Sequence, residues 1–164
     1  MESLFSETSE SQGSFRLDLC TWPEVDEYLK TSKGVIVPIG STEQHGPTGA
    51  IGTDAFTAEA VARELAKKMG VIVAPTISFG MAEHHLGFPG TISLQPSTLM
   101  SVVHDVVISL AGHGFERIFF VNGHGGNIAT SKAAFAEAYK TASTRNFSVA
   151  RKLRCKISSW FMTS

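Results

Sequence analysis

The sequence has few cysteines and no long apolar segment. Its 164 residues include only two cysteines, Cys20 and Cys155, which lie far apart and belong to no Cys-x-x-Cys pair. This spacing argues against a disulfide framework and a thiolate metal site, and it favours reduced, structural thiols. No apolar run approaches the roughly eighteen residues of a membrane span, and the N-terminus lacks a basic start followed by an apolar core. We therefore expect a cytoplasmic protein without a membrane partner.

Neither sign of charge dominates the sequence. The formal net charge is −1, 43% of the residues are hydrophobic, and the mean hydropathy is +0.08. These values are typical of one soluble globular domain that buries a core. A near-neutral balance argues against nucleic acid as a partner. We interpret the local basic cluster as a solvated face; it consists of Arg151, Lys152, Arg154 and Lys156.

Apolar patterns predict alternating strands and helices in a single domain. Residues 1–14 have little apolar pattern and are expected to form a disordered tail, and residues 15–164 form the domain. Buried strands are predicted at 34–40, 71–75, 117–122 and 156–161, with a short strand at 92–94. Amphipathic helices are predicted at 23–30, 56–69, 96–110 and 128–139. This order favours an α/β fold with parallel strands and right-handed crossovers.

Residues that can bind metals follow two of the predicted strands. His124 lies in a glycine-rich turn after the strand at 117–122, and Glu43 and His45 follow the strand at 34–40. Glu43 and His45 are two positions apart, which places both side chains on one side of an extended segment. Asp54 begins the next helix. Because ligands gather at the carboxyl ends of parallel strands, we expect these four residues to be candidate metal ligands.

Other interpretations of these turns remain open. The segment at 123–127 would serve equally as a flexible strand-to-helix turn with a solvated histidine. It fits neither the Gly-x-Gly-x-x-Gly fingerprint nor a P-loop, which argues against a nucleotide-binding module. The polar loop at 80–90 is long enough to fold over a site, and its histidines, His84 and His85, either face a substrate or lie on the surface.

Four motifs occur in the order in which they occur in one known family. The chain resembles the creatininase (creatinine amidohydrolase) family in residues 38–47, in residues 52–54, in His85 with residues 88–91, and in residues 122–127. The resemblance implies a three-layer α/β/α sandwich with a mostly parallel sheet. It also implies a homo-oligomer, which is a hexamer in the family, and a small-molecule amide as the substrate.

The family's metal ligands match Glu43, His45, Asp54 and His124, with Asp54 as the carboxylate that bridges two ions. The resemblance implies zinc, manganese or iron, and a metal-bound hydroxide that attacks an amide carbonyl. Glu43 and His85 are the candidate catalytic residues. The expected function is a metal-dependent amidohydrolase acting on a non-peptide C–N bond of the cyclic amide or formamide type.

The chain departs from the family at two points. Gly126 stands where creatininase has a glutamate that completes the second metal site, so the second ion is less well supported than the first. The resemblance implies a further C-terminal part that supplies much of the substrate pocket, and we expect the given sequence to be either a fragment of a longer protein or a naturally short form. The alternative hypothesis is therefore a non-catalytic, truncated member that acts as a subunit or regulatory isoform.

Overall fold

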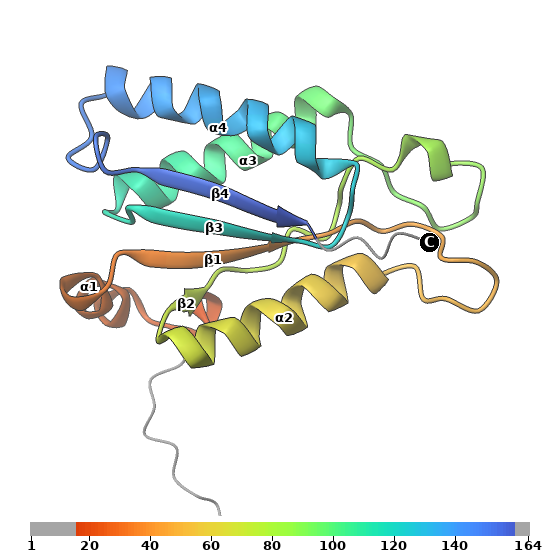
Figure 1. Ribbon diagram of the computed structural model, residues 1–164, viewed down its shortest axis with the longest axis horizontal. Coiled ribbons are helices and arrows are strands. Elements are labelled where there is room, and N and C mark those ends of the chain that lie inside the picture. The colour runs from red at the N-terminus through yellow and green to blue at the C-terminus, as the bar shows by residue number, and fades with distance from the viewer. Residues whose placement is uncertain (1–15, 160–164) are drawn as a thin grey trace, which may run out of the picture.

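Four parallel strands form one sheet in the order β2–β1–β3–β4 (Figure 1). The computed structural model describes residues 16–159. The strands are β1 (Gly34–Ile39), β2 (Ile72–Val73), β3 (Arg117–Asn122) and β4 (Arg154–Ser159). β1 and β3 pair along their whole lengths, from Gly34 opposite Arg117 to Ile39 opposite Asn122. The carboxyl ends of the two central strands therefore lie side by side.

Helices cover both faces of the sheet (Figure 1). They are α1 (Trp22–Thr31), α2 (Thr53–Met69), α3 (Pro96–Gly112) and α4 (Asn127–Thr144), with short 3-10 helices η1 (Leu17–Leu19) and η2 (Glu83–His85). α3 and α4 lie over one face and α2 over the other. The predicted three-layer α/β/α sandwich with a parallel sheet is confirmed.

β1 is buried on both faces, as its continuous apolar run predicts. Val35, Val37 and Ile39 point into the core shared with α3 and α4, whereas Ile36 packs against the alanines of α2. All six residues of the strand are buried. The sheet therefore gives the loop after β1 a rigid base.

Two of the predicted strands differ in the structure. The strand predicted at 71–75 is only Ile72–Val73. The N–H of Val71 donates to the Ala66 carbonyl in the last turn of α2, and Pro75 has no N–H to donate to the neighbouring strand. The segment predicted as a strand at 92–94 makes only isolated bridges, Ile92 to Thr42 and Ser93 to Gly80. It ties together the loops above the sheet and does not extend the sheet.

Some predictions fall outside the described residues. The tail at 1–14 and the last two residues of the strand predicted at 156–161 are not described. The division into tail and domain thus stays a prediction. Within 16–159, no helix has the length and apolar character needed to cross a membrane.

Candidate metal centre

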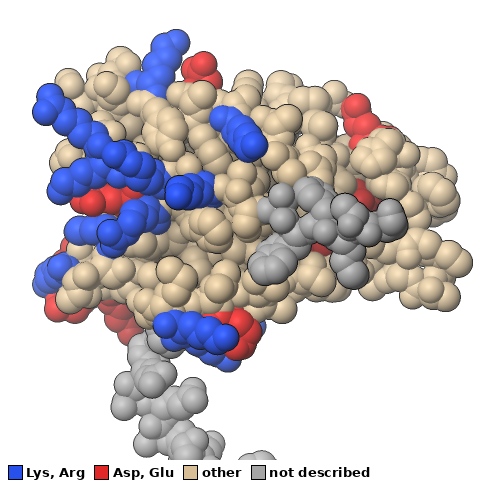
Figure 2. Space-filling view, viewed as in Figure 1, with Lys and Arg blue, Asp and Glu red and all other residues tan. Residues whose placement is uncertain are grey.

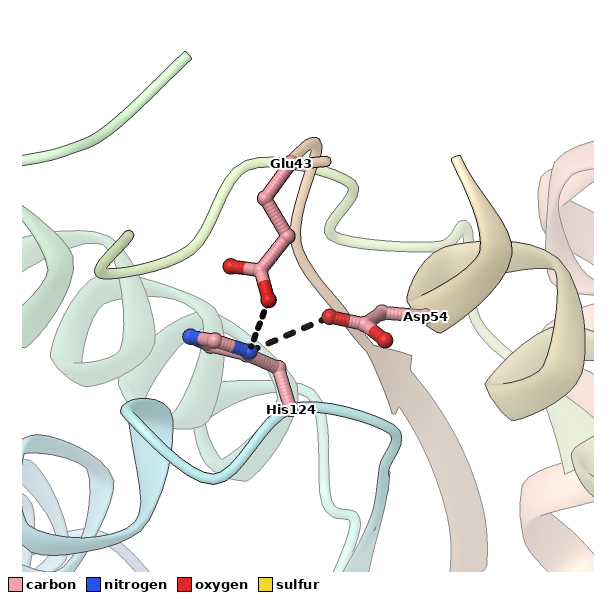
Figure 3. Close-up of side chains that lie close together, drawn as sticks. All are labelled: Glu43, Asp54 and His124. Carbon is pink, nitrogen blue, oxygen red and sulfur yellow. Dashed lines mark ion pairs between the residues drawn. The ribbon is translucent and has the colours of Figure 1, made fainter. Parts of the chain in front are cut away.

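Three polar side chains from separate segments converge beyond the carboxyl ends of β1 and β3 (Figure 3). Glu43 lies in the loop after β1, Asp54 in the first turn of α2, and His124 in the loop between β3 and α4. Their ligand atoms lie within 4.8 Å of one another, and all three residues are buried. His124 Nδ1 is 3.2 Å from Glu43 Oε1 and 3.1 Å from Asp54 Oδ2.

Two glycines let the first turn of α2 approach the strand ends. A Cβ on Gly40 would lie 2.4 Å from the backbone nitrogen of Ala55, and a Cβ on Gly123 would lie 2.2 Å from the Asp54 carbonyl oxygen. Neither position has room for a side chain. The close packing of backbone on backbone is what holds Asp54 next to His124.

Two buried asparagines fix the loop that carries His124. Asn122 accepts a hydrogen bond from the His124 N–H and donates one to the His124 carbonyl. Asn127 donates to the Gly40 carbonyl and accepts from the Met81 N–H, so it links the loop to β1 and to the segment before η2. The turn at 123–127 is therefore held by specific hydrogen bonds, contrary to the interpretation as a flexible turn.

The ring of His124 is held so that its lone pair faces the two carboxylates. Nε2 lies 2.9 Å from the Met81 carbonyl oxygen, which can only accept a hydrogen bond. With its proton on Nε2, the neutral ring presents an unprotonated Nδ1 to Glu43 and Asp54. Metal-binding histidines usually have this arrangement, with one nitrogen donating to a carbonyl and the other bound to the metal.

His45 repeats this arrangement on the other side of Asp54. Its Nδ1 lies 3.1 Å from the Glu43 carbonyl oxygen, and its Nε2 lies 2.9 Å from Asp54 Oδ1. Both ring nitrogens of each histidine thus face oxygen acceptors, and a neutral ring has a proton for only one of them. A second proton or a cation is needed between each histidine and Asp54.

The carboxylate of Asp54 lies between two ligand positions. Its Oδ2 faces His124 and Glu43, and its Oδ1 faces His45. The first position has three ligand-type residues. The second has His45 and Asp54, and no other cluster of three such residues was found within residues 16–159. The structure therefore brings together all four predicted ligands, but it completes a three-residue set at one position only.

The buried charges at this site fit a bound cation. Glu43 Oε2 and Asp54 Oδ2 are buried and receive no hydrogen bond, apart from the ion-pair contact between Asp54 Oδ2 and His124. Burial by itself lowers the pKa of His124, but the interactions with Asp54, the Met81 carbonyl and Glu43 outweigh it, so the pKa of His124 is raised. Buried carboxylates without a positive partner are costly, and a divalent ion would supply that partner.

The predicted loop does fold over the site. His85 Nε2 lies 3.5 Å from Glu43 Oε1. His84 is exposed, and the centroid of its ring lies 4.1 Å from that of His85. The ring of His84 is also nearly parallel to that of His124, with 6.3 Å between the centroids. The roles of Asn122, Asn127 and the Met81 carbonyl were not predicted from the sequence. The only sequence signal was an asparagine at each end of the glycine-rich turn.

Comparison with known proteins identifies the family. A model of the family described as "Creatininase: Creatinine amidohydrolase" matches residues 18–164. The chain belongs to the creatininase family. The predicted family resemblance is confirmed.

Curated relatives of this chain differ in the substrates that their names give. The mycofactocin precursor peptide peptidase of Mycolicibacterium smegmatis is 42% identical over 62% of this chain and 43% of its own length. The 3-dehydro-scyllo-inosose hydrolase of Thermotoga maritima is 35% identical over 64% of this chain and 34% of its own. The creatinine amidohydrolase of Pseudomonas putida is 33% identical over 63% of this chain and 42% of its own length. The chain thus spans less than half the length of these relatives.

Solved creatininase structures share the fold. A crystal structure of creatinine amidohydrolase (creatininase) has a TM-score of 0.84 and 25% identity, over 90% of this chain and 58% of that one. Creatininases named for Zn–Zn and Mn forms have TM-scores of 0.83 and 26% identity, over 89% of this chain and 58% of theirs.

Proposed function

We propose that this creatininase-family chain binds a divalent metal ion at Glu43, Asp54 and His124 and takes part in metal-dependent hydrolysis of an amide C–N bond. The observation that carries the proposal is the arrangement of His45 and His124 around Asp54. Each ring has one nitrogen at a backbone carbonyl and the other at the same carboxylate. Metal-binding histidines usually have this arrangement, with one ring nitrogen at a carbonyl oxygen and the other free to bind the ion.

The residues of the site would have separate roles in metal binding and catalysis. Glu43, Asp54 and His124 hold the ion, and His45 with Asp54 forms the incomplete second position. The ion would supply Lewis-acid polarisation of a carbonyl oxygen and would lower the pKa of a water molecule. Imidazole with carboxylate suits zinc, manganese or iron, and the names of the Zn–Zn and Mn creatininases make zinc and manganese the first ions to test. Glu43 and His85 stay our candidate catalytic residues.

A small-molecule amide of the cyclic or formamide type is the proposed substrate, with water splitting the C–N bond into a carboxylic acid and an amine. The creatinine amidohydrolase relative supports this class. A peptide substrate is the second candidate, because the peptidase from M. smegmatis is 42% identical to this chain.

The test is conversion of a panel of amides to their hydrolysis products, separated by chromatography, by protein that is first stripped with a chelator and then reloaded with zinc or manganese. The panel contains creatinine, a formamide and a short peptide. We expect hydrolysis only after reloading, and we expect Asp54→Asn to abolish it. The matched control is Asp26→Asn, which makes the same change on an exposed part of α1.

Two results would count against the proposal. Hydrolysis that survives exhaustive chelation would exclude a metal-dependent reaction. Metal binding without hydrolysis of any member of the panel would favour the alternative of a non-catalytic family member. Preference for the peptide over creatinine would move the substrate to the second candidate.

A further inference from the structure

Gln44 lies between Glu43 and His45 in the sequence, and two contacts fix the orientation of its side-chain amide. The N–H of Gly46 donates to Gln44 Oε1 at 2.8 Å. The other end of the amide, Nε2, lies 2.9 Å from His85 Nδ1. A flipped amide would place its NH₂ group against the Gly46 N–H, donor against donor, so only the observed orientation satisfies both contacts.

The amide orientation decides which nitrogen of His85 carries the proton. An amide NH₂ group can only donate, so His85 Nδ1 must accept and is unprotonated. The proton of the neutral ring is then on Nε2, the nitrogen that lies 3.5 Å from Glu43 Oε1. This polarity is opposite to that of His45 and His124. Those two rings present a lone pair to a carboxylate, whereas His85 presents an N–H.

We propose that Gln44 is a positioning residue that holds His85 as the Nε2–H tautomer and thereby directs a hydrogen-bond donor at Glu43. The role rests on the proposed function, because the orientation of Glu43 matters only if Glu43 binds an ion. In this arrangement His85 is a partner of a metal ligand and is not itself a ligand. An N–H beside Oε1 restricts rotation of the carboxylate, while its Oε2 is buried without a hydrogen bond.

Residues 44 and 85 are 41 positions apart, and their contact also joins the two loops above the sheet. Gln44 follows β1, and His85 ends η2. A change at Gln44 that preserved the fold would therefore alter the proton position on His85 without touching His85 itself. This separates the proposed role from a merely structural one.

The test is nitrogen NMR of the zinc-loaded and the zinc-free protein with ¹⁵N-labelled histidine, with the His85 signals assigned by their loss in His85→Gln. We expect Nδ1 unprotonated and Nε2 protonated in the wild type. Gln44→Glu keeps an acceptor for Gly46 but turns the donor toward His85 into an acceptor, so we expect Nδ1 to become protonated. Asn146→Asp adds the same charge at an exposed position far from the site and should leave both nitrogens unchanged.

A second variant tests the consequence for Glu43. Gln44→Met removes the donor without adding charge, and we expect zinc affinity, measured by competition with a chelator, to fall about tenfold. A protonated Nδ1 in the wild type, no change in Gln44→Glu, or unchanged zinc affinity in Gln44→Met would overturn the proposal. Absence of zinc binding in the wild type would instead remove the proposed function, since the tautomer is measured without zinc as well.

Discussion

His45 and His124 each use one ring nitrogen for a backbone carbonyl and turn the other toward Asp54. Within residues 16–159, every ion pair of Glu43 and Asp54 is with a histidine, and none is with lysine or arginine. The positive charge that balances these carboxylates must therefore come from protons or from a metal ion. The two compete for the same lone pairs.

This competition predicts how the stability of the metal-free protein depends on pH. Because the pKa of His124 is raised in the folded state, its protonation contributes stability that is fully present below about pH 6.5, the ordinary value for histidine. That contribution is lost as the pH rises through the raised pKa. We expect the difference in urea midpoint between wild type and His124→Gln, both stripped of metal, to shrink on going from pH 6 to pH 8.

Zinc should reverse this trend, since it binds the unprotonated ring. The increase in the wild-type urea midpoint on adding zinc should grow over the same pH range. A wild-type advantage over His124→Gln that increases with pH in metal-free protein would contradict the proposed competition.

The residues that bear ligand atoms were predictable, and those that position them were not. Glu43, His45, Asp54 and His124 have side chains of recognisable metal chemistry and stand at strand ends, where parallel sheets gather ligands. The Met81 carbonyl that orients His124 has no such signature, because every residue has a carbonyl. The direction of the amide of Gln44 depends on Gly46 and His85 together, which only the fold brings into contact.

At the scale of the elements, the site depends on how closely α2 approaches the ends of β1 and β3. We expect Gly40→Ala to displace the first turn of α2, because the new Cβ would lie 2.4 Å from the Ala55 nitrogen. Overpacking of this kind costs about 1–3 kcal/mol, and it should also weaken zinc binding by moving Asp54. Denaturant unfolding and chelator competition measure the two effects.

Gly87→Ala is the matched control, because a Cβ at that position meets nothing within 4 Å. It should change neither the free energy of unfolding nor zinc affinity to a comparable extent. Wild-type stability and zinc affinity in Gly40→Ala would show that the approach of α2 tolerates a side chain, contrary to the structure.

The same elements show where sequence patterns predict structure well. β1 and β3 were predicted nearly to the residue, since a run that is buried on both faces is apolar at nearly every position. The pattern at 71–75 continued past the point where Pro75 ends the ladder. At 92–94, single bridges to Thr42 and Gly80 depend on loop positions that no local pattern contains.

Considered as a whole, the molecule separates its basic surface from the candidate site. Figure 2 shows Lys and Arg side chains gathered on the side where β3 and β4 begin and α4 ends, whereas the site lies beyond the opposite ends of the strands. The four residues of the basic cluster are exposed, in agreement with a solvated face. The expected homo-oligomer, the cytoplasmic location and the absence of a nucleic-acid partner stay predictions.

The central claim is that Glu43, Asp54 and His124 bind a metal ion, and the most direct test is anomalous diffraction at the zinc absorption edge from crystals of the zinc-loaded protein. We predict an anomalous peak about 2.0–2.2 Å from one ligand atom of each of the three residues. A weaker second peak between His45 and Asp54 would show that a second ion binds at the incomplete position. A peak elsewhere with none at these three residues, or no peak at all, would contradict the account.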